Sequence, residues 1–164
     1  MLHPGKSLVF VASLALGIGA LGTAQAGETL KGAVEGSAHF ADGKSPANGF
    51  QTTDATGKVS HLGRTSALLE MVPRLSGPKG APAGFIGSAT LTSANGDALD
   101  MFIVTGAPEF SKSDDGTIDV ATFTGHYRMD GGTGRFTDAS AASRIVITIR
   151  CDFYNKTWTI TISW

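Results

Sequence analysis

The sequence has little cysteine, little charge and few long apolar runs, and each shortage excludes a class of protein. The single cysteine, Cys151, among 164 residues excludes an internal disulfide framework and a zinc site built from several thiolates. Charged residues make up only 16%, and 13 basic residues face 14 acidic ones, so there is no basic excess to bind nucleic acid. Beyond residue 26, no apolar run approaches the roughly 20 residues of a spanning helix, so we expect no membrane span in the processed chain.

The residues that are abundant favour a sheet protein. Hydrophobic residues make up 41% of the chain, which is enough for a packed core, and glycine contributes 22 residues. Glycine at this level fits many turns better than it fits a helical bundle. The length is that of one domain of ordinary size.

Residues 1–26 have the pattern of a cleavable signal peptide. Lys6 supplies the positive start, residues 7–21 are mostly apolar, and Ala24-Gln25-Ala26 ends the segment with small residues at the expected spacing. The alternative is an N-terminal membrane anchor, for which the apolar run is short. We therefore predict cleavage after Ala26, export to the periplasm or beyond, and a single mature domain over residues 27–164.

The clearest strand pattern lies near the C-terminus. Apolar residues alternate with others over 145–153 and again over 158–164, which predicts an antiparallel hairpin closed near Tyr154-Asn155-Lys156. Cys151 falls in the apolar row of the first strand. We interpret it as a buried small hydrophobic residue, against a nucleophile or a link to another chain, because no sequence neighbour would stabilise a thiolate.

A second hairpin is expected over residues 85–93 and 98–104. Asn95-Gly96 between these segments is typical of a tight type I′ turn, in which both central residues have positive φ. Leu99, Met101 and Ile103 alternate along the returning strand and are expected to share one buried face.

Three further segments read as strands with less regular patterns. Residues 30–40 carry regularly spaced glycines that suggest close packing or curvature. Residues 58–72 form either a bent strand or a strand followed by a helical turn over 66–71, and Pro73 is expected to end either one. Residues 117–129 form a long strand with Phe123, Tyr127 and Met129 on one face.

These segments give seven or eight strands and no amphipathic helix, with loops expected over 41–48 and 74–83. The predicted fold class is all-β, a single antiparallel closed β-barrel of about eight strands, with a sandwich as the alternative. A barrel has no free edges and accommodates the glycine content.

The most distinctive motif is Gly131-Gly132-Thr133-Gly134-Arg135-Phe136. It lacks the Lys-Ser/Thr of a phosphate-binding loop and the surrounding helix of a dinucleotide site, so we interpret it as a structural turn. Its members in that role are Gly131, Gly132, Thr133, Gly134 and Phe136. Together with Ala139-Ser140-Ala141, His61-Leu62-Gly63-Arg64-Thr65 and the segment 90–97, the motif resembles the allene oxide cyclase-like and dirigent-like barrels, as an exported bacterial member.

The resemblance implies an eight-stranded antiparallel barrel with an apolar interior. Plant members of this family cyclise an unstable epoxide or steer radical coupling, mainly by shaping the substrate and excluding water. Their catalytic residues lie outside the shared motif, so none is carried over to this chain and the catalytic residues stay unknown. The sequence also has Ala141-Ala142 where the family usually has a glycine.

A metal centre is not expected. His39, His61 and His126 are far apart in sequence and lack the short His-x-His or His-x₃-His spacings that ligands often show. No motif points to a cofactor, so we expect neither metal nor cofactor.

Six polar residues are the candidates for binding a ligand. Each lies beside apolar residues or within a motif-like string, so its side chain would contact a small molecule if it pointed into a barrel. The six candidates are His61, Arg64, Glu70, Asp100, His126 and Arg128. The ordinary alternative for each is a solvated side chain on the outer face. The sequence does not decide which face of the strand near His126 lines the interior.

Three functions are compatible with these features. The first is an exported barrel that binds a small apolar or amphipathic molecule, or serves as a structural module, without catalysis. The alternative is a cyclase or isomerase that uses the cavity, as the resemblance implies. A third is a protein-interaction domain, which would need an exposed apolar patch. The sequence leaves the ligand and the oligomeric state, including a homo-oligomer, open.

Overall fold

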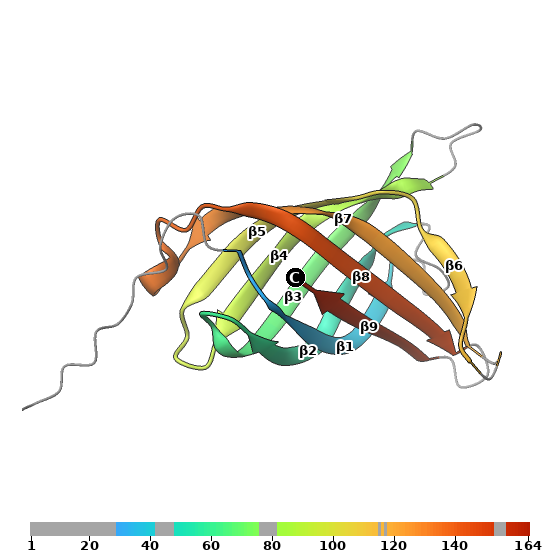
Figure 1. Ribbon diagram of the computed structural model, residues 1–164, viewed down its shortest axis with the longest axis horizontal. Helices are drawn as coiled ribbons and strands as arrows, with labels where there is room; N and C mark the ends of the chain where they lie inside the picture. The colour runs from blue at the N-terminus through green and yellow to red at the C-terminus, as the bar shows by residue number, and fades with distance from the viewer. Residues whose placement is uncertain (1–28, 42–47, 76–81, 115, 117, 153–156) are drawn as a thin grey trace, which may run out of the picture.

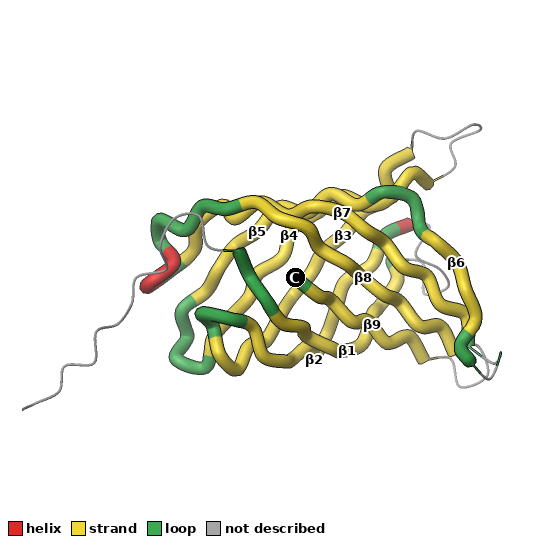
Figure 2. Tube along the Cα trace, viewed as in Figure 1, coloured by secondary structure: helices red, strands yellow, loops and turns green. Residues whose placement is uncertain are grey.

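The protein folds into a closed β-barrel, seen here in a computed structural model that describes residues 29–41, 48–75, 82–114, 116, 118–152 and 157–164 (Figure 1). Strands cover most of these residues (Figure 2). In chain order they are β1 (Gly32–Phe40), β2 (Phe50–Val59), β3 (Gly63–Leu75), β4 (Pro82–Ser93), β5 (Ala98–Thr105), β6 (Glu109–Lys112), β7 (Asp119–Gly132), β8 (Ala142–Asp152) and β9 (Thr157–Ser163). A short 3-10 helix, η3 (Gly134–Phe136), follows β7. The predicted signal peptide lies outside the described residues.

The sheet order is β5-β4-β3-β2-β1-β9-β8-β7-β6, and an additional pairing of β5 with β7 closes it. All pairings are antiparallel. The result is an eight-stranded barrel with β6 as an extra strand, which confirms the predicted fold class. Beyond Thr105 the chain continues along the same edge of β7, and β6 pairs with β7 alone among the described strands (Figure 1).

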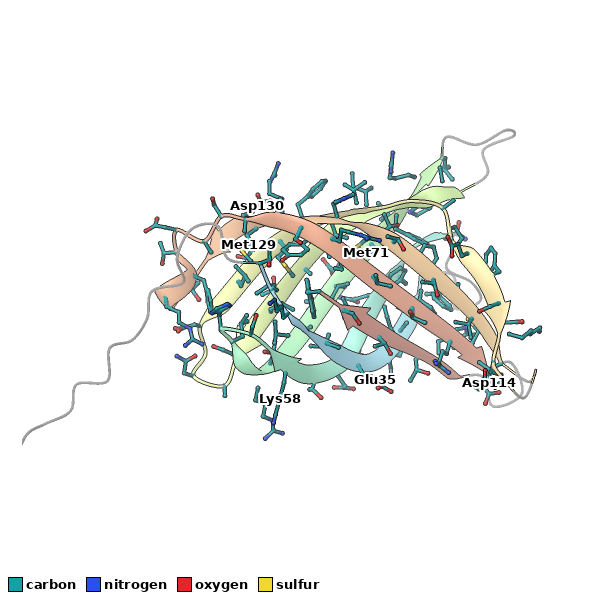
Figure 3. All side chains as sticks on the ribbon, viewed as in Figure 1. Glu35, Lys58, Met71, Asp114, Met129 and Asp130 are labelled. Atoms are coloured by element: carbon teal, nitrogen blue, oxygen red, sulfur yellow. The ribbon has the colours of Figure 1, made fainter. Side chains whose placement is uncertain are left out.

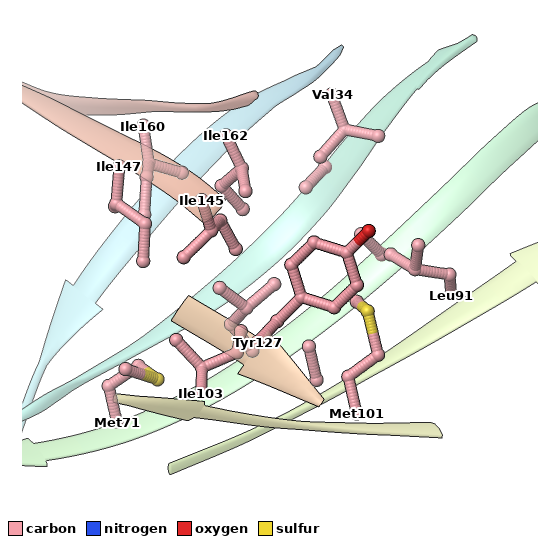
Figure 4. Close-up of a cluster of buried hydrophobic side chains, with 14 of the residues drawn as sticks. Val34, Met71, Leu91, Met101, Ile103, Tyr127, Ile145, Ile147, Ile160 and Ile162 are labelled. Atoms are coloured by element: carbon pink, nitrogen blue, oxygen red, sulfur yellow. The ribbon is translucent and has the colours of Figure 1, made fainter. Parts of the chain in front are cut away.

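Alternating side chains fill the barrel. Apolar residues from all eight strands of the barrel point inward, and the largest fully buried ones include Tyr127, Leu91, Met101, Ile103 and Ile147 (Figure 4). At one end the interior is packed with aromatic rings, edge to face: Phe50 with Phe85 at 5.1 Å and Phe85 with Phe123 at 5.0 Å between centroids. Charged side chains such as Lys58 and Asp130 project outward, whereas Met71 and Met129 lie inside (Figure 3).

Both predicted hairpins are confirmed as strand pairs, β8 with β9 and β4 with β5. The expected rows are buried: Ile145, Ile147, Ile149 and Cys151 on β8, Ile160 and Ile162 on β9, and Leu99, Met101 and Ile103 on β5. The turn expected at Tyr154–Lys156 lies outside the described residues.

The turn between β4 and β5 is not the type I′ turn that Asn95-Gly96 predicted. Of these two residues only Gly96 has positive φ, at 90°, and its N–H donates to the Ser93 carbonyl. This is the pattern of a type I turn followed by a glycine bulge. Asn95 keeps the negative φ that is ordinary for an L residue, and its side chain bonds to the neighbouring turn residues Ser93 and Asp97.

The segment 58–72 also differs from expectation. A turn at residues 60–62 separates β2 from β3, and β3 continues through 66–71 as a strand, so the helical-turn alternative was wrong. Pro73 does not end β3, which runs on to Leu75. A proline is tolerated there because the pairing with β2 has already ended at Met71 and the register with β4 shifts just after Pro73.

A bulge in β2 places one polar side chain inside the barrel. The register slips between Gln51 and Ala55, where Asp54 has a φ of 53°. The hydroxyl of buried Thr52 restores the broken ladder: it accepts the Leu69 N–H at 2.7 Å and donates to the Ala67 carbonyl at 3.5 Å. The Thr52 hydroxyl therefore replaces, for the backbone of β3, the hydrogen-bond partner that the bulge in β2 removes.

Replacing this hydroxyl tests the account. Thr52→Val keeps the shape but leaves a buried N–H without a partner, so we expect the free energy of unfolding to fall by about 1–3 kcal/mol. Thr56→Val, on the exposed face of the same strand, should change it by no more than about 0.5 kcal/mol. Urea unfolding monitored by circular dichroism measures both, and equal effects would contradict the role of Thr52.

Candidate functional site

All six candidate residues lie on the exposed surface of the barrel. Glu70, Asp100, His126 and Arg128 point outward from β3, β5 and β7. His61 lies in the turn after β2 with a φ of 64°, and Arg64 follows at the start of β3. The face near His126 that the sequence left undecided is therefore the outer one. None of the six supplies a polar group to the interior.

The polar side chains that are buried hold the backbone instead. Within the described ranges, the buried hydroxyls of Thr52, Thr65, Ser93 and Thr105 each bond to a main-chain group. The Tyr127 hydroxyl, inside the barrel, accepts the Leu30 N–H at 2.9 Å (Figure 4). Burial raises the pKa of this phenol above its ordinary value. These hydroxyls already have structural partners.

Two of the six candidates are joined by an outward row that crosses six strands. Its members lie directly opposite one another from β1 to β7, in the order His39, Gln51, Glu70, Ser88, Phe102 and Arg128. We call this the outer row. His126 lies one step away along β7, opposite Val104 and Arg144. His61 and Arg64 lie near the β2–β3 turn and do not join the row.

A groove of about 640 Å³ runs along most of the outer row. Its polar lining comes from His39, Asn48, Gln51, Glu70 and Ser88, and its apolar lining includes Val72, Ile86 and Phe102. Val72 is 57% exposed and lies directly opposite Ile86. This surface therefore places uncovered apolar side chains beside hydrogen-bonding groups.

Side-chain contacts fix the groups in and beside the groove. The Gln51 amide donates to Glu70 Oε1 at 2.8 Å, and His39 Nε2 bonds with Thr53 Oγ1 at 2.8 Å. Beyond Phe102, Arg128 donates to both carboxylate oxygens of Asp130, at 2.7 and 3.2 Å. This pairing lowers the pKa of Asp130 and raises that of Arg128.

Apart from Glu70, the groove residues were not among the sequence candidates. Gln51, Ser88 and Phe102 become neighbours only through the register of four paired strands, and one of these, β2, was not predicted. The predicted β4–β5 hairpin did not supply this contact either, because a two-residue turn at Asn95-Gly96 would set Ser88 opposite Ile103, one residue from its observed partner Phe102.

The glycine-rich motif lies at one end of the β5–β7 contact, beside Ala98, whereas the groove reaches β5 at Phe102. Thr133 exchanges two hydrogen bonds with Ala98, one from its backbone N–H and one through its hydroxyl, at 2.8 and 2.9 Å. Gly134 passes so close to Asp97 that a Cβ would overlap the carboxylate. Phe136 is buried, at 1% exposure. In this arrangement the motif joins the β7–β8 connection to the β4–β5 turn.

Comparisons with known proteins add no relative: no family model, no curated protein and no solved structure matches the chain. The resemblance to allene oxide cyclase-like and dirigent-like barrels therefore stays a prediction. In the described part of the chain, no three His, Cys, Asp or Glu side chains gather as metal ligands would. The same part holds no helix of the length and apolarity needed to cross a membrane.

Cys151 is buried among the apolar residues of β8, as its place in the alternating row predicted. Burial raises the pKa of its thiol, and the nearby Asp119 carboxylate adds to the effect, while a contact with Trp158 opposes it. The reactive thiolate is disfavoured for both reasons.

We therefore expect the native protein to resist thiol alkylation. With iodoacetamide at pH 8, Cys151 should react about 100-fold or more slowly in the folded protein than in urea, because reaction requires opening of the barrel. Mass spectrometry follows the added group over time. Similar rates in the two states would show that the thiol is accessible and available for chemistry or cross-linking.

Proposed function

We propose that the protein is an exported, non-catalytic binding module that holds a small amphipathic molecule in the groove on the outer face of β1–β5. The export part of the proposal depends on the leader pattern of residues 1–26 alone. The binding part keeps the ligand class expected from the sequence and assigns it to the outside of the barrel instead of the inside.

The groove is the observation that carries the proposal. Its volume of about 640 Å³ falls in the range of small-molecule sites, roughly 300–1,000 Å³. An exposed apolar wall next to a few oriented polar groups is the arrangement that binds one molecule by both its apolar body and its polar end. Val72 and Ile86 supply the wall, and the Gln51–Glu70 pair supplies the polar end.

The side chains inside the barrel support the same proposal. A cyclase-like mechanism needs at least one polar group aimed at a substrate inside the barrel. The buried hydroxyls of the described residues bond to the backbone, and large apolar side chains fill the space between them. The cyclase or isomerase alternative therefore depends on the family resemblance alone.

Native mass spectrometry of the protein, purified without denaturation, tests the proposal. We expect a reproducible mass excess that organic solvent releases. Ile86→Arg should abolish it, because the long charged side chain occupies the groove. Thr148→Arg, on the outer face of β8 away from the groove, is the matched control and should retain it.

Two results would contradict the proposal. One is an excess mass that survives Ile86→Arg, which would place the molecule elsewhere. The other is a bare chain mass in the unmodified protein together with no binding of added amphipathic probes. A dimer without any ligand would favour a structural or interaction role for the same apolar surface.

A further inference from the structure

We infer that the molecule held in the groove carries a positive charge: it is a small organic ammonium compound with an apolar chain. The inference rests on the proposed function, since it names the class of ligand for the same groove. It follows from the charges that line and border the groove and from the distance between its charged and apolar parts.

Glu70 gives the groove its charge. Among the described residues that line it, Glu70 is the only carboxylate, and no lysine or arginine is present. The Gln51 amide orients the carboxylate through a 2.8 Å hydrogen bond, but a neutral donor does not cancel its charge. An ammonium ion is the natural partner of a carboxylate oriented in this way.

The nearest cation along the outer row does not oppose this preference. Arg128 lies two strands beyond Ser88, outside the groove. Its charge is balanced by the Asp130 carboxylate, to which it donates two hydrogen bonds. Its guanidinium also lies over the Phe102 ring, 5.7 Å from the centroid. Neither Arg128 nor Arg74, whose guanidinium donates to the Thr105 carbonyl beyond Val72, lines the groove, so Glu70 is the carboxylate or cation nearest to a molecule held among the described lining residues.

The apolar part of the ligand is expected to lie across the strands. Phe102 is two strands from Glu70 in the outer row, a separation of about 10 Å. Ile86 and Val72 lie alongside this path, one row away. An ammonium group at Glu70 would thus leave an alkyl chain in contact with Ile86, Val72 and the ring of Phe102.

Three probes of equal chain length and different charge test the inference: octylammonium, 1-octanol and octanoate. Titration of the purified protein, followed by calorimetry or NMR, should give the tightest binding for octylammonium and the weakest for octanoate. Glu70→Gln should weaken octylammonium binding about five-fold and leave 1-octanol unchanged. Glu35→Gln, an exposed carboxylate on β1 outside the groove, is the matched control and should change neither.

The outcomes separate the inference from the proposed function. If 1-octanol or octanoate binds as tightly as octylammonium, or if Glu70→Gln has no effect, the charge assignment is overturned. In that case the proposed function still stands provided that Ile86→Arg abolishes binding. If none of the probes binds, the inference is overturned, and the retained mass in native spectrometry then decides the proposed function separately.

Discussion

The contact between β5 and β7 is the constraint on which the rest of the structure depends, because it turns an open sheet into a barrel. A glycine lies near each end of this contact. A Cβ at Gly125 would overlap the Val104 carbonyl oxygen, and a Cβ at Gly132 would overlap that of Ala98. The two strands can therefore approach closely only because both positions lack a side chain. Without closure, β5 and β7 would each present a free edge able to pair with another chain.

Closure also decides which side chains are available for function. With eight strands, a barrel interior is just wide enough for its own side chains, and here apolar residues and aromatic rings take that space. The buried hydroxyls bond to the backbone at a bulge, a turn or a strand end. The side chains left to contact another molecule are therefore those of the outer surface, where the register of β1–β5 lines up the outer row beside Val72 and Ile86.

Much of the fold was predictable because its strands alternate cleanly. The residue types of 145–152, 158–162 and 99–103 gave the correct buried faces. The strand count left a barrel and a sandwich open, and the closed barrel was preferred because it has no free edges and accommodates the glycine content. Strand β2 was missed because it is mostly polar and its bulge at Asp54 breaks the period of two. The groove could not be predicted for a related reason: its residues come from five strands, so their proximity requires every intervening register, and single-strand patterns do not contain that information.

We propose that a small amphipathic molecule binds outside the barrel, and intermolecular NOEs locate such a molecule directly. In a methyl-labelled sample saturated with octylammonium, the alkyl protons should show NOEs to the methyl groups of Val72 and Ile86. Interior methyl groups such as those of Ile103, Ile147 and Ile162 should show none. NOEs to these interior residues would place the molecule inside the barrel and contradict binding in the outer groove. They would favour a cyclase-like mechanism inside the barrel instead.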